Sequence, residues 1–152
     1  MRLRLLAAPL ATALLLLATG CGGHGESADP DADRVSPVAD TSTCLADAQQ
    51  VTSYPDGYPQ DYPLPEGTVV FSVEDRGADG IVATGVTDTP FDEVLREMNA
   101  AAGAGFSRTS GETEEDDAEA NWQGNGFTGR WSIKKSATCS GETVVQLLAK
   151  AT

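Results

Sequence analysis

The three cysteines of this chain, Cys21, Cys44 and Cys139, constrain its fold more than any other feature. Cys21 follows a short basic start and an apolar run from Leu5 to Ala18, which together have the pattern of a secretory signal peptide. As a helix this run spans about 21 Å, short of the roughly 30 Å of bilayer hydrocarbon, so an uncleaved membrane anchor is the weaker alternative. We therefore expect the rest of the chain to fold in an oxidising compartment, where disulfides persist.

The residues just before Cys21 resemble the lipobox of bacterial lipoproteins. The match runs from Leu17 to Cys21 and has small residues between them, although Ala18 stands where the family usually has leucine. The resemblance implies that residues 1–20 are removed and that Cys21 becomes an N-terminus carrying lipid such as palmitate. It thereby implies a protein anchored on the extracytoplasmic face of the cell membrane, with free secretion as the alternative.

If Cys21 carries lipid, Cys44 and Cys139 remain as a single pair. A disulfide between them would join the start of the folded region to a point near its end. It would close a loop of about 100 residues, which the chain-entropy model values at about 4–5 kcal/mol. Because small domains are only marginally stable, this would be a large share of the total. We therefore predict a Cys44–Cys139 disulfide.

Residues 21–43 are rich in Gly, Ser, Ala, Asp and Pro and contain almost no large apolar side chain. They cannot bury enough surface to offset the entropy of ordering, so we predict a flexible acidic tether. The whole chain has 23 acidic and 10 basic residues, a formal net charge of -13. Contacts to phosphate need clustered Lys and Arg, so this charge argues against a nucleic-acid partner.

Three Tyr-Pro pairs follow the tether at four-residue intervals, beginning at Tyr54, Tyr58 and Tyr62. Proline fixes its own φ and disfavours helix in the preceding residue, so this segment is predicted to be extended or turn-like. Two roles are open for the tyrosines. Either their rings pack onto the domain, or they form an exposed aromatic strip that binds a protein partner or a glycan.

The pattern of residues 44–152 predicts one α+β domain. Alternating side chains at 69–73 and a β-rich run at 81–87 flank a turn and predict a hairpin. A third strand is expected to start at Phe106, and an almost entirely apolar run at 143–149 is typical of a central strand. The resulting order, ββαββββ, places one helix on an antiparallel sheet of five or six strands.

The single helix is predicted from a start signal and an apolar stripe. Thr89 precedes Pro90, so we expect Thr89 to cap a helix whose first position is Pro90, and Gly103 or Gly105 to end it. The stripe expected to face the core comprises Phe91, Val94, Leu95, Met98, Ala101 and Ala102.

The Asn125-Gly126 pair is the strongest short hairpin signal in the chain. The register that this turn sets pairs each tryptophan with a small residue: Trp122 with Gly129, and Trp131 with Ala120. These tryptophans are expected in the core rather than on a ligand platform.

Six acids crowd into residues 112–119: Glu112, Glu114, Glu115, Asp116, Asp117 and Glu119. They are expected at a solvated hairpin end. Because clustered carboxylates bind hard cations, they are also the candidate cation patch, although no metal is assigned because nothing in the sequence fixes a cage. A carboxylate-dependent hydrolase, which would use a pair of these acids, is a less favoured alternative because no cleft with aromatic sugar platforms is implied nearby.

No catalytic constellation stands out. The one histidine, His24, lies in the tether, so the serine, cysteine and lysine side chains lack a histidine partner in the domain. We therefore assign no catalytic residue and no cofactor, and we expect the protein not to be an enzyme.

The chain as a whole resembles small lipoproteins of high-GC Gram-positive (actinobacterial) type. The features that carry this resemblance are the lipobox, the acidic tether, the Tyr62–Gly67 segment before a strand, the Thr89–Leu95 helix start and the Trp131 strand. Most members of that group are uncharacterised, so the resemblance implies a location rather than an activity. We expect a non-catalytic module that binds an envelope protein or a cell-wall component, with its candidate partner surface at Tyr54, Tyr58 and Tyr62. A small-ligand or divalent-cation binding domain is the alternative.

Overall fold

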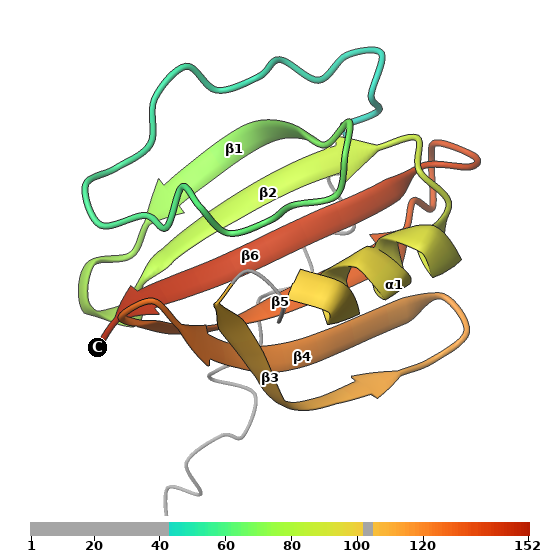
Figure 1. Ribbon diagram of the computed structural model, residues 1–152. Coiled ribbons are helices and arrows are strands. Elements are labelled where there is room, and N and C mark those ends of the chain that lie inside the picture. The colour runs from blue at the N-terminus through green and yellow to red at the C-terminus, as the bar shows by residue number, and fades with distance from the viewer. Residues whose placement is uncertain (1–42, 102–104) are drawn as a thin grey trace, which may run out of the picture. The chain divides into compact units, whose positions relative to one another are not determined.

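The computed structural model describes residues 43–101 and 105–152 (Figure 1). The chain divides into two units, Met1–Ala32 and Asp33–Thr152, and every described residue belongs to the second. The predicted signal peptide, Cys21 and the predicted tether except Thr43 lie outside the described residues. Within the described ranges, no helix is long and apolar enough to cross a membrane.

Six strands form one sheet: β1 (Val69–Asp75), β2 (Ile81–Thr87), β3 (Phe106–Thr113), β4 (Asp117–Gly124), β5 (Phe127–Lys135) and β6 (Thr143–Ala151). Their spatial order is β1-β2-β6-β5-β4-β3, and all neighbours are antiparallel. A 3₁₀ turn, η2 (Gly77–Asp79), joins β1 to β2, and the helix α1 (Phe91–Ala100) follows β2. The predicted α+β fold, one helix on an antiparallel sheet in the order ββαββββ, is therefore confirmed.

The last strand of the chain occupies the middle of the sheet. β6 pairs with β2 on one side and with β5 on the other (Figure 1). Its first five residues, 143–147, are all buried, which explains why this run lacks the polar alternation of a strand with one wet face. The prediction of a central strand at residues 143–149 is confirmed.

The β4–β5 hairpin forms around the predicted turn. Asn125 has φ 50° and Gly126 has φ 82°, both in the left-handed region that two-residue hairpin turns of this kind require. The predicted pairs, Trp122 with Gly129 and Trp131 with Ala120, are the observed ones.

The main core cluster lies on one face of the sheet, under α1 and under the segment that carries the Tyr-Pro pairs (Figure 1). Trp131 and Leu147 of the sheet and Met98 of the helix are almost completely buried. The Tyr62 ring lies 4.9 Å from Phe106 and 4.7 Å from Trp122, measured between ring centroids. Both tryptophans are buried core residues, as expected.

The start of α1 differs from the prediction. The helix begins at Phe91, and Pro90 occupies the cap position with an extended ψ of 145°. Thr89 does not cap it: the Thr89 hydroxyl donates instead to the Glu66 carbonyl at 3.4 Å and accepts from Thr87 Oγ1 at 3.1 Å. The physical reason is that the turn at Glu66 offers a long-range acceptor that a local helix signal cannot reveal.

The predicted apolar stripe of α1 faces the core. Phe91, Val94, Met98 and Ala101 are buried, and Leu95 is partly buried and packs against the edge of the core. The helix ends at Ala100, before both predicted glycines. Ala102 and Gly103 lie outside the described residues.

Candidate functional site

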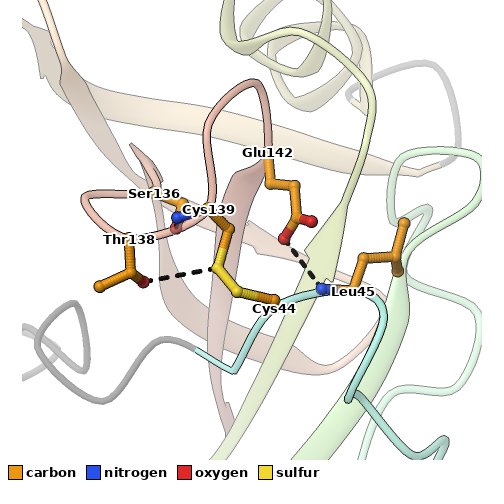
Figure 2. Close-up of a disulfide and its surroundings, with 6 residues drawn as sticks. All are labelled: Cys44, Leu45, Ser136, Thr138, Cys139 and Glu142. Carbon is orange, nitrogen blue, oxygen red and sulfur yellow. Dashed lines mark hydrogen bonds between the residues drawn. A yellow bond between two sulfur atoms is a disulfide. The ribbon is translucent and has the colours of Figure 1, made fainter.

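A disulfide joins Cys44 to Cys139, as predicted, and their Cα atoms are 5.6 Å apart (Figure 2). Cys139 is buried in the loop between β5 and β6. Beside it, Glu142 Oε2 accepts a hydrogen bond from the Leu45 backbone N–H at 2.9 Å, and Ser136 Oγ accepts one from the Cys139 N–H at 3.0 Å. The start of the domain is thus fastened to the loop that precedes the central strand.

This junction also holds the one described group of three potential metal ligands, Cys44, Cys139 and Glu142, whose ligand atoms lie within 4.8 Å of one another. A metal would need both sulfurs as thiolates, and the disulfide consumes them. Glu142 is already engaged by the Leu45 N–H. In its disulfide form the junction therefore has a structural role.

The strap, residues 51–67, contains the three Tyr-Pro pairs. Two of its prolines begin turns, because the Tyr58 N–H donates to the Pro55 carbonyl and the Tyr62 N–H donates to the Pro59 carbonyl, each at 3.2 Å. Turns repeated at the four-residue spacing bring Tyr58 and Tyr62 to the same side, against the sheet. The strap therefore owes its shape to the Tyr-Pro repeat.

The exposed aromatic strip made of all three tyrosines is not what the structure shows. Tyr58 and Tyr62 are only 8% and 5% exposed, and both belong to the core. Tyr54 alone is partly exposed. Burial raises the pKa of the Tyr58 and Tyr62 phenols well above their usual range.

An open groove of about 670 Å³ lies between the beginning of the strap and β1. It is lined by Gln49, Gln50, Val51, Thr52, Ser53, Tyr54, Pro55, Phe71 and Val73. Its volume is that of a small-ligand site. None of these nine side chains is charged, although 22% of the residues in the chain are.

Gln50 holds the groove in shape. Its Oε1 accepts a hydrogen bond from the Val70 N–H at 3.1 Å, and its Nε2 donates to the Tyr54 hydroxyl at 3.4 Å. The Val51 N–H donates to the Val70 carbonyl at 2.8 Å. The Tyr54 ring also stacks on Tyr58, with centroids 4.8 Å apart and 17° between the planes. The Tyr54 side chain is thereby held at its hydroxyl by Gln50 and at its ring by Tyr58.

Other polar side chains of the groove are available to a ligand. Gln49, Thr52 and Ser53 make no side-chain hydrogen bond within the described part of the chain. Sequence reasoning placed the candidate surface on the tyrosines and missed these residues. The signal that could have found them is the uncharged polar run just before the first Tyr-Pro pair.

The six acids of the candidate cation patch lie at the end of the β3–β4 hairpin and at its strands, which confirms the hairpin placement. The structure does not gather them into a ligand set. Asp116 pairs with Lys135 at 2.9 Å, and Glu119 pairs with Arg130 at 3.5 Å. The hydrogen bond that Lys135 donates to Asp116 also raises the pKa of the Lys135 amine. The patch is an ion-paired hairpin rather than a cation cage.

Comparison with protein-family models, with curated proteins and with solved structures finds no match to this chain. The groove and the disulfide junction must therefore be interpreted from the chemistry of their own residues.

Proposed function

We propose that this protein is a non-catalytic binding module, anchored by lipid on Cys21 to the extracytoplasmic face of the cell membrane. The observation that carries the binding part is the uncharged groove beside β1. It combines a volume of ligand size, free polar side chains and an aromatic ring held in one orientation. These are the properties of a pre-formed recognition site.

The chemistry of the groove supports binding over catalysis. Its lining includes no carboxylate, amine, thiol or imidazole. These are the groups that most often transfer protons or attack substrates, and the Tyr54 phenol is the one titratable group that remains. A ligand in this groove would meet hydrogen-bonding and stacking groups without an acid–base pair.

The disulfide supports the extracytoplasmic location. Structural disulfides persist in oxidising compartments and are rare in the reducing cytosol. The Cys44–Cys139 bond uses two of the three cysteines of the chain, and Cys21 remains for the proposed lipid. One disulfide and one lipid anchor together account for all three cysteines.

Fractionation of the native host tests the anchor. Cys21→Ser should move the protein from the membrane fraction to the soluble or secreted fraction, because the lipid is the proposed attachment. Ser27→Ala, a change of similar size in the same predicted tether, should leave the protein in the membrane fraction. If Cys21→Ser remains membrane-bound although residues 1–20 have been removed, the lipid anchor is excluded.

A further inference from the structure

We propose that the groove between the strap and β1 binds a neutral polysaccharide chain. This inference rests on the proposed binding function and names the class of ligand. The net charge of -13 repels polyanions from the surface, and the acids that would attract a polycation lie elsewhere than in the groove. An uncharged site on such a chain selects an uncharged ligand.

The lining matches the two kinds of surface that a sugar ring presents. A sugar stacks its C–H face on aromatic rings and directs its hydroxyls to side chains that donate and accept hydrogen bonds. Tyr54 and Phe71 supply the rings, while Gln49, Thr52 and Ser53 supply an amide and two hydroxyls. Because Gln50 and Tyr58 already hold Tyr54, the ring loses little freedom on binding.

The edge of β1 argues against an extended peptide as the occupant. A peptide that adds a strand needs free backbone groups on the edge of the sheet. At Val70, however, the N–H is bonded to Gln50 Oε1, and the carbonyl accepts from the Val51 N–H. Further along β1, the exposed Glu74 and Asp75 make the edge acidic. Beside Val70, recognition in the groove therefore relies on side chains, as recognition of a sugar does.

Affinity electrophoresis tests this proposal with the full mature chain carrying Cys21→Ser, which removes the lipid. The gels contain a neutral glucan, a neutral mannan, a neutral galactan or the anionic polygalacturonate. We expect at least one neutral polysaccharide to retard the protein and polygalacturonate to leave it unretarded. No retardation by any of the three neutral polymers, or equal retardation by polygalacturonate, overturns the proposal.

Variants locate the binding in the groove. Tyr54→Ala, and separately the double variant Gln49→Ala with Ser53→Ala, should weaken retardation by about tenfold, which corresponds to roughly 1.4 kcal/mol. Gln49 and Ser53 are exposed and make no side-chain hydrogen bond within the described ranges, so the double variant keeps the fold. Gln123→Ala on β4, an exposed glutamine outside the groove, is the matched control and should bind like the parent. Unchanged retardation of the double variant would overturn the assignment to the groove.

A neutral Gly/Ser/Thr peptide is the probe for the competing occupant. If the peptide shifts the Tyr54 and Phe71 resonances in an NMR titration and no polysaccharide does, the groove binds peptides and the sugar assignment is wrong, while the binding function stands. If neither the peptide nor any polysaccharide shifts these resonances, both the sugar assignment and the binding function of the groove are wrong. The membrane fractionation of Cys21→Ser is independent of all these outcomes.

Discussion

Cys44 and Cys139 bring together two points of the chain that are 95 residues apart. Closing a loop of this length removes much of the freedom of the unfolded chain. The hydrogen bond from Leu45 to Glu142 beside the disulfide shows that the same junction is also held by the native backbone. The disulfide should therefore stabilise the native fold without straining the junction.

Removing this bond should have a large effect on stability. Cys44→Ser is expected to lower the free energy of unfolding by about 4–5 kcal/mol, measured by urea titration. The double variant Cys44→Ser with Cys139→Ser should lose the same amount, because either change removes the same loop closure. Melting of the parent that does not change when reductant is added would contradict this account.

Tyr58 carries a second prediction at the scale of a single residue. Its hydroxyl is buried and has no hydrogen-bond partner within the described residues. A buried polar group without a partner costs about 1–3 kcal/mol. Tyr58→Phe should therefore leave the melting temperature unchanged or raise it. A clear fall would show that the hydroxyl has a partner in solution.

At the scale of elements, α1 distinguishes core from edge. Met98 is 2% exposed, and Leu95 packs against the core only in part. Met98→Ala should cost about 2–5 kcal/mol, the range for a buried side chain that leaves a cavity. Leu95→Ala should cost clearly less. Equal losses in denaturant titrations would mean that both side chains face the core.

The strap makes stability sensitive to alkali. Burial keeps the Tyr58 and Tyr62 phenols protonated to a higher pH in the folded state than the ordinary pKa of 10.0 that they have when exposed. Because a raised pKa contributes stability below the unfolded value, that contribution should be complete below about pH 10 and be lost as the pH rises further. Denaturant titrations from pH 8 to pH 11 should show this loss, and Tyr58→Phe should reduce it.

Local patterns predicted elements well, and long-range contacts explain what they missed. The Asn125-Gly126 turn and the central strand at residues 143–149 are local or compositional signals, and both are confirmed. The role of Thr89 depends on Glu66, 23 residues away, and the shape of the groove depends on the bond between Gln50 and Val70, 20 residues apart. The residue pattern of a short segment cannot predict hydrogen bonds between residues that lie 20 or more positions apart.

At the scale of the whole molecule, the charged hairpin and the uncharged groove are separate parts of the surface. The acids of the β3–β4 hairpin are partly neutralised by Lys135 and Arg130. The groove beside β1 stays free of charge. In this acidic chain, the groove is the uncharged surface that the proposed neutral ligand would bind.

The most direct test of the central claim is the intact mass of the protein extracted from the membrane of its native host. We predict a chain that begins at Cys21, with the added mass of acyl chains at its N-terminus and with two hydrogens fewer for the Cys44–Cys139 bond. A membrane-derived chain that begins elsewhere, or that carries no lipid, would contradict the account.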